Sequence, residues 1–286
     1  YYSQEVRVYS LVLLLSVLSM YAFAVLVQRG GARWSIANAI ANFLLVFTHL
    51  FAVQVLVVQA CFLILRRFRN RRLLLTWFAC NAMIGMGLAA WVFTIDKAAL
   101  GSAASWMVKP GLREVLMLLL VFVGGRASNE NPAAHLPSGI SLDVILAVIV
   151  LALILWHVVR SLLEGSSWNR DSRVLLVLWL VIPPTLLFVF SFVWRPCFVY
   201  RYVLFSALPL YALAGAAFAA IRNSLARRTV IAVVLTLYAH QLTALAVGPF
   251  RPDWKSVARH IESKCTPRDK ILVFQDINLI ALQFNS

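Results

Sequence analysis

Polar side chains that could bind a charged group gather at three places in an otherwise apolar chain. The first group contains Gln4, Glu5, Arg7 and Tyr9. If this stretch is helical, Glu5 and Tyr9 lie one turn apart on one face, with the other two alongside. A carboxylate, a guanidinium and a phenol at a water–lipid boundary can order a polar headgroup. An interfacial anchor with a surface ion pair explains the same pattern, and periodicity alone favours that alternative.

The second and third groups contain histidine and arginine. Thr48 and His49 lie between apolar runs. The imidazole could donate a hydrogen bond to a phosphate or a sugar hydroxyl, or it could be satisfied by backbone or water. In the third group, aromatic residues such as Tyr202 bracket Arg195 and Arg201. A planar guanidinium binds phosphate oxygens in bidentate fashion, which suits an anionic lipid headgroup, whereas an aromatic belt with snorkelling arginines is the alternative.

Other signatures of catalysis are missing from the sequence. The four cysteines have no metal-ligand spacing, and no nucleotide-binding glycine loop or nucleophile triad is present. The short basic clusters each adjoin an apolar run, so they indicate membrane orientation rather than nucleic-acid binding. We therefore name no metal ligand and no cofactor, although a divalent metal stays open.

The elements that position these groups must be membrane helices. The chain of 286 residues is 62% hydrophobic and 13% charged, with a net charge of +15, whereas a soluble domain is roughly 45–50% apolar and about 25% charged. This excludes a soluble enzyme, a disordered tail and a secreted disulfide scaffold, and it predicts an all-α polytopic membrane protein. The clear candidate spans are 8–27, 73–95, 140–162, 174–194, 203–221 and 229–247.

Region 35–65 allows two interpretations. As one helix it would be about 46 Å long and would put the flanking basic clusters on opposite faces of the membrane. A hairpin of two short helices that turns at Thr48-His49 keeps both clusters on one face, as the positive-inside tendency prefers. We favour the hairpin, which makes about eight transmembrane helices. The apolar run at 112–124 is too short to cross, so we expect a helix lying at the interface.

The C-terminal part has a different character. We expect an amphipathic helix at 254–264, a turn at 266–269 and a strand at 270–274, which is how an external α/β domain would begin. This divides the chain into a transmembrane domain, 1–247, and the start of a soluble domain, 248–286. Both ends look cut, so we expect the middle of a longer protein, with the three polar groups on the external face.

Five motifs in order along the chain resemble the bacterial branch of the polyprenyl-phosphate-sugar glycosyltransferases, a membrane superfamily with the GT-C fold. This branch is similar to the dolichyl-phosphate-mannose protein mannosyltransferases of glycosyltransferase family 39 and to the lipid A aminoarabinose transferases. Val6 and Val8 depart conservatively from the family pattern. The motifs are Tyr1-Tyr2-Ser3-Gln4-Glu5-Val6-Arg7-Val8-Tyr9, Phe47-Thr48-His49, Trp106-Met107-Val108-Lys109-Pro110 with Gly124-Gly125, Arg195-Pro196 with Arg201-Tyr202, and Asp253-Trp254 with Pro267 and Asp269.

The resemblance implies an enzyme of the cell (inner) membrane, multi-pass, with an external active site. It would move a sugar from a polyprenyl-phosphate lipid to a glycan, lipid or protein acceptor. The general-base aspartate of the family lies in a loop that would precede Tyr1, so the resemblance names no catalytic residue here. A fragment without that loop could therefore be inactive on its own.

The resemblance also implies roles in binding. Glu5 and Arg7 would line the external cavity, and Arg195 and Arg201 would neutralise the carrier phosphate. His49, like Tyr202, would hold phosphate or sugar by hydrogen bonds.

A polyprenyl-linked lipid transporter or flippase without transferase activity is the competing function. It would use the same external arginines, but it also needs polar residues through the bilayer. The predicted spans carry few ionisable groups, apart from His157 and His240 near their ends. This weighs against a translocation path.

Overall fold

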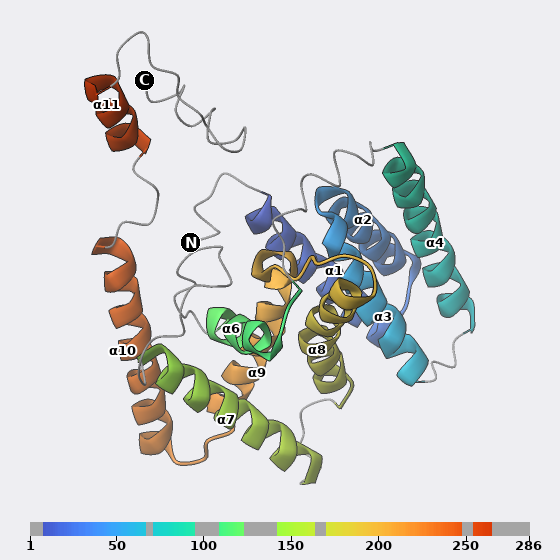
Figure 1. Ribbon diagram of the computed structural model, residues 1–286. Coiled ribbons are helices and arrows are strands. Elements are labelled where there is room, and N and C mark those ends of the chain that lie inside the picture. The colour runs from blue at the N-terminus through green and yellow to red at the C-terminus, as the bar shows by residue number, and fades with distance from the viewer. Residues whose placement is uncertain are drawn as a thin grey trace. The chain divides into compact units, whose positions relative to one another are not determined.

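The computed structural model describes residues 8–66, 71–94, 109–122, 142–163, 170–247 and 254–264, shown as ribbons in Figure 1. Nearly all of these residues are helical, and none of them lies in a strand. The predicted turn at 266–269 and strand at 270–274 lie outside the described residues. The elements are α1 (Tyr9–Arg29), α2 (Ala32–Thr48), η1 (Leu50–Ala52), α3 (Val53–Leu65), α4 (Arg71–Thr94), α6 (Leu112–Phe122), α7 (Leu142–Leu163), α8 (Arg170–Val193), η2 (Tyr200–Ser206), α9 (Ala207–Ala219), α10 (Ser224–Val247) and α11 (Trp254–Lys264).

The chain divides into two compact units, Tyr1–Leu237 and Tyr238–Ser286, with the boundary inside α10. The first unit contains the bundle described below. The second contains α11, and the helix predicted at 254–264 is confirmed. An external α/β domain and a domain boundary at 247/248 stay predictions.

Two glycines turn the chain from α1 into α2. Gly30 and Gly31 have φ angles of 66° and 98°, a region that residues with a Cβ rarely adopt. The Gly30 N–H donates to the Leu26 carbonyl at 2.8 Å and closes the last turn of α1. The chain therefore reverses sharply, and α1 and α2 pack side by side.

Region 35–65 forms two helices. His49 is extended, with φ −154° and ψ 118°, and it ends α2. The single turn of η1 then leads into α3. The amide of Asn42 in α2 donates to Gln59 in α3 at 3.1 Å, so α3 runs back along α2. The predicted turn at Thr48-His49 is confirmed and the single tilted helix is wrong, whereas a membrane crossing by each short helix stays a prediction.

Four stretches of the described residues are long and apolar enough to cross a membrane. The predicted spans at 8–27, 73–95, 174–194 and 203–221 each overlap one of these stretches. The predicted spans at 140–162 and 229–247 are also helical, as α7 and α10. Their crossing of the membrane, and the total of eight helices that cross, stay predictions. The four stretches are Tyr9–Arg29, Arg71–Trp91, Arg170–Val193 and Tyr200–Ala219.

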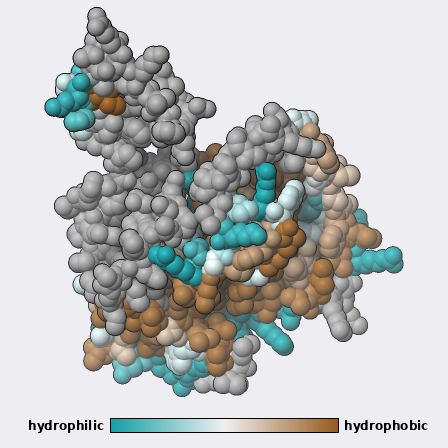
Figure 2. Space-filling view, viewed as in Figure 1, coloured by the Kyte–Doolittle hydropathy of each residue, from teal (hydrophilic) through white to brown (hydrophobic). Residues whose placement is uncertain are grey.

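The surface of the bundle is strongly apolar. Figure 2 shows hydrophobic side chains over much of the described surface. Large examples include Leu14, Phe93 and Val193, which are 56%, 80% and 81% exposed. Soluble monomers rarely expose extended apolar patches. This surface suits contact with lipid, and with the four long apolar helices it makes the chain an all-α membrane protein.

An aromatic core holds α1, α3 and α4 together. The ring of Phe23 in α1 meets Phe62 of α3 and Trp77 of α4 edge-on, with centroid separations of 5.8 and 6.3 Å. All three side chains are at most 5% exposed. Edge-to-face pairs at such distances are favourable beyond the area they bury. This core packs α1, α3 and α4 against one another.

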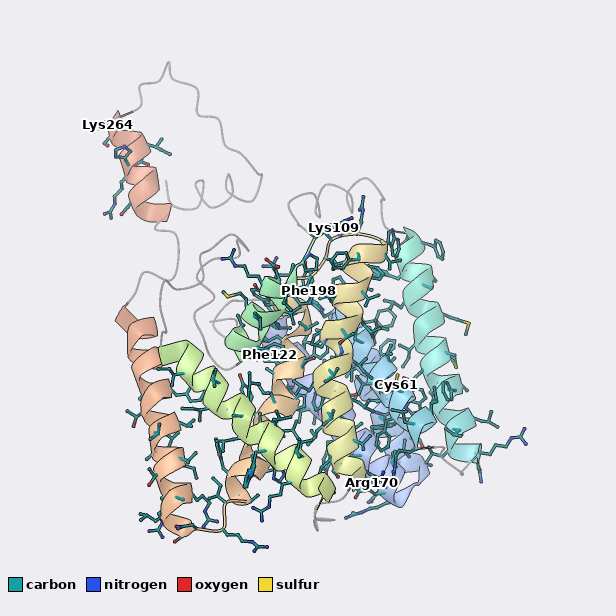
Figure 3. All side chains as sticks on the ribbon, turned by 60° about the horizontal axis from the view of Figure 1, so that its bottom comes forward. Cys61, Lys109, Phe122, Arg170, Phe198 and Lys264 are labelled. Carbon is teal, nitrogen blue, oxygen red and sulfur yellow. The ribbon has the colours of Figure 1, made fainter. Side chains whose placement is uncertain are left out.

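The bundle has two chemically different ends. At one end, Arg66 after α3 forms an ion pair with Asp171 in the first turn of α8. In Figure 3, Arg170 lies at this end of α8 and Phe198 lies near its other end. We call these the Arg170 end and the His49 end.

Candidate functional site

Predicted site residues come together at the His49 end. His49 lies between α2 and η1, and its carbonyl accepts from the Ala52 N–H at 2.9 Å. Tyr9 begins α1 and is 7% exposed. Arg201 and Tyr202 lie in η2, which contacts both α1 and η1. Three segments that are far apart in the sequence therefore meet where helices begin or end.

The rings at this end form one connected group. The His49 ring lies 5.7 Å from that of Tyr9 and 5.6 Å from that of Tyr202, measured between centroids. Phe51 stacks on Tyr202 at 4.5 Å with an interplanar angle of 16°. The Arg201 guanidinium carbon lies 5.6 Å from the centroid of the Tyr202 ring, in cation–π range. We call these five residues the aromatic site.

His49 is electrically neutral at neutral pH. Burial, and then the positive charge of Arg201, hold the pKa of its imidazole below the ordinary value of 6.5. Its Nδ1 is buried and has no hydrogen-bond partner among the described residues. A neutral imidazole has one donor and one acceptor nitrogen. His49 can therefore offer a hydrogen bond to a ligand while Arg201 supplies the positive charge.

Two of the remaining predicted site residues, Thr48 and Arg195, make none of the ring contacts described above. The Thr48 hydroxyl donates to the Leu44 carbonyl at 2.6 Å, so it is directed along α2. Arg195 is exposed in the connection between α8 and η2. Gln4, Glu5 and Arg7 lie outside the described residues. The proposed pairing of these three with Tyr9 on one helical face stays a prediction.

A serine–cysteine contact directs the chain into η2. The buried Ser191 hydroxyl donates to the Leu187 carbonyl at 2.7 Å and accepts from the Cys197 N–H at 3.2 Å. Burial raises the pKa of the Cys197 thiol despite the opposing effect of its contact with Ser191. The thiol is thus a neutral packing group. This contact holds Cys197 against α8. It therefore fixes where η2, which contains Arg201 and Tyr202, begins.

Sequence reasoning missed a carboxylate near η2. Glu114, in the first turn of α6, accepts a hydrogen bond from the Gly111 N–H at 2.6 Å. The charges of Glu114 and its neighbour Arg113 both act on the Tyr200 phenol. The Gly-x-x-Glu spacing is typical of a helix N-terminus and could have located this carboxylate. Sequence reasoning also missed Phe51, although it lies only two residues after His49.

A buried polar network was missed as well. The side chains of Ser19, Asn38, Asn42, Gln59 and Asn81 are each at most 9% exposed, yet they lie inside the apolar bundle. Asn42 donates to Asn81 at 2.8 Å, and Gln59 donates to Ser19 at 2.8 Å. The network links α1, α2, α3 and α4 through hydrogen bonds. The four-residue spacing of Asn38 and Asn42 was the available signal, since it puts two amides on one face.

The network positions the aromatic site. It fixes α2 against α1 and α3, and α2 ends at His49 while α1 begins at Tyr9. Polar groups inside a membrane bundle hydrogen-bond to one another because lipid offers no partner. A beginning or end of each of these three helices lies next to the site. The axial positions of α1, α2 and α3 relative to one another therefore decide whether the rings of the aromatic site meet.

Neither a search for metal-binding groups nor comparison with known proteins adds to the description of this site. Among the residues that the structure describes, no group of three His, Cys, Asp or Glu side chains could hold a metal ion. No family model, curated protein or solved structure matches the chain. The class that the fold defines is an all-α membrane protein with a cationic aromatic site at one end of the bundle.

Proposed function

We propose that this chain forms part of a membrane glycosyltransferase that takes a sugar from a polyprenyl-phosphate carrier. The observation that carries the proposal is the convergence of Tyr9, His49, Arg201 and Tyr202 at one end of the bundle. These residues belong to three of the motifs that resemble the family. Their meeting in space supports a shared binding role.

The site divides the work between charge and hydrogen bonding. Arg201 carries a permanent positive charge that can bind phosphate oxygens through two parallel N–H groups. Negative charge grows on the carrier phosphate as the sugar leaves it, so a fixed cation there speeds transfer. His49, kept neutral, supplies a hydrogen bond to phosphate or sugar without adding a second charge.

Transfer by the full-length protein tests this proposal. Proteoliposomes receive radiolabelled polyprenyl-phosphate sugar, and release of the carrier and labelling of an acceptor are measured. Arg201→Ala is expected to lower the transfer rate by about 10²–10³-fold, as for loss of one group that stabilises developing charge. Arg222→Ala, an exposed arginine in the connection after α9, is the control and should leave the rate within about twofold. Transfer that is unchanged by Arg201→Ala would refute the role of Arg201.

The same preparation separates the transferase from a transporter. A polyprenyl-linked lipid transporter also binds the carrier phosphate, so binding alone does not distinguish the two functions. A transporter moves the intact labelled lipid between leaflets without breaking the bond between sugar and phosphate. Movement of intact lipid without carrier release would therefore favour the transporter.

A further inference from the structure

A second cationic site lies at the Arg170 end of the bundle. The C-terminal end of α7 and the start of α8 both lie at the Arg170 end of the bundle (Figure 3). The charge of Arg173, in the first turn of α8, reaches His157 in the C-terminal half of α7. Both side chains are buried, at 6% and 8% exposure. A buried guanidinium is unfavourable unless a partner compensates its lost hydration. The surroundings of Arg173 therefore indicate what it binds.

Arg173 has no such partner within the described part of the chain. Its Nε and Nη1 atoms are buried without a hydrogen-bond partner there. Asp171, the carboxylate two residues before it, pairs with Arg66, which follows α3. The first turn of a helix carries partial positive charge from the backbone, which makes a cation still less favourable. Positive charge is thus in excess at this buried position.

Neighbouring residues place Arg173 at the depth of lipid headgroups. Trp156 of α7 is 41% exposed, and the Arg160 guanidinium carbon lies 5.2 Å from the centroid of its ring. An exposed tryptophan beside an arginine near the end of an apolar helix is typical of the membrane–water interface. His157 directly follows Trp156 in α7. The buried cation therefore lies where membranes carry their phosphates.

From these observations we infer that α7 and α8 bind the phosphate of an anionic phospholipid headgroup between Arg173 and His157. A guanidinium fork matches two phosphate oxygens, and an imidazole N–H can donate to a third. Basic pockets between transmembrane helices bind anionic headgroups in this way. The site does not depend on transferase activity. Free phosphate has the same chemistry, so the test distinguishes the two sources.

Lipid retention by the full-length protein in nanodiscs tests the site. Wild type is expected to retain phosphatidylglycerol over phosphatidylcholine by about tenfold or more, measured by native mass spectrometry, because charged hydrogen bonds hold the phosphate. Arg173→Gln should reduce this preference to nearly one. Arg170→Gln removes an exposed arginine from the same helical turn and should change the preference by less than about twofold.

Thermal unfolding gives a second readout. In phosphatidylcholine alone, Arg173→Gln should unfold at a higher temperature than wild type, because an uncompensated buried charge has been removed. Adding phosphatidylglycerol should stabilise wild type and leave the variant unchanged. Inorganic phosphate at millimolar concentration is the other arm. If it alone stabilises wild type and not Arg173→Gln, the site binds soluble phosphate rather than lipid.

Two results would overturn the inference. One is equal lipid preference and equal phosphate response in wild type and Arg173→Gln. The other concerns Glu164, which lies outside the described residues. If Glu164→Gln removes the stability difference between wild type and Arg173→Gln, the partner of Arg173 is the Glu164 carboxylate and not a phosphate. Arg173→Lys keeps the charge without the planar fork and should retain part of the preference even if Arg173→Gln does not fold.

Discussion

Replacing Gln59 with leucine removes the centre of the buried polar network. Gln59 is completely buried in α3. Its amide donates to Ser19 at 2.8 Å and accepts from Asn42 at 3.1 Å and from Trp77 at 3.2 Å. Leucine has a similar size but no hydrogen-bonding group. Asn38 also donates to Gln59 at 3.4 Å, so the substitution removes hydrogen bonds from buried partners on α1, α2 and α4.

The expected loss follows from the three shortest of these bonds. A side-chain hydrogen bond between membrane helices contributes about 0.6 kcal/mol on average and up to about 1.7 kcal/mol. Asn42 keeps its hydrogen bond to Asn81 at 2.8 Å, so the substitution removes only part of its hydrogen bonding. We expect Gln59→Leu to lower the free energy of unfolding by about 2–4 kcal/mol. For a chain of this size that lowers the melting temperature by about 5–15 °C.

The assay is thermal unfolding of the purified protein in nanodiscs, with Gln54→Leu as the matched control. Gln54 lies in the same helix and is 7% exposed, but its Oε1 has no hydrogen-bond partner among the described residues. The control should be neutral or stabilising, because a poorly satisfied amide is replaced by an apolar group. Equal losses for the two variants would refute the network. Combining Gln59→Leu with Asn42→Leu should destabilise less than the sum of the two, since they share a bond.

Two further predictions concern the site and the first turn. The His49 pKa lies below 6.5 in the folded protein, so the stability from its neutral form is fully present above pH 6.5 and is lost as the pH falls through the lowered pKa. Melting temperature against pH should show this loss for wild type and not for His49→Asn, and parallel curves would contradict it. Gly30→Ala should cost about 1–3 kcal/mol in chemical unfolding, because φ 66° and ψ −162° suit only glycine. Gly85→Ala, inside α4 with open space around its Cα, should be neutral or stabilising, and similar effects of the two substitutions would argue against backbone strain.

Long apolar runs made the helices predictable, because burial in lipid leaves the backbone no other way to satisfy its hydrogen bonds. The turn at His49 was predictable because one helix over 35–65 would have separated basic clusters. Within the site, His49, Arg201 and Tyr202 were identified from residue type and position. Phe51 was not, since a phenylalanine beside an apolar helix carries no signal of its own.

Contacts between distant segments could not be predicted. Asn42 and Asn81 are 39 residues apart, and their hydrogen bond depends on how α2 packs on α4. In the sequence Arg173 is one of several basic residues next to an apolar run, whereas the structure buries it. Burial of a charge is a property of packing, so residue type and spacing do not reveal it.

The polar network has a consequence for how the chain is made. Ser19 and Asn42 are synthesised first, Gln59 next, and Trp77 and Asn81 last. Until α4 emerges, the amides of α2 lack half of their partners and would face lipid at a cost of several kcal/mol. With 17 residues, about 25 Å, α2 is also shorter than the hydrocarbon core of roughly 30 Å. We therefore expect α1 to α4 to leave the insertion machinery as one group rather than one helix at a time.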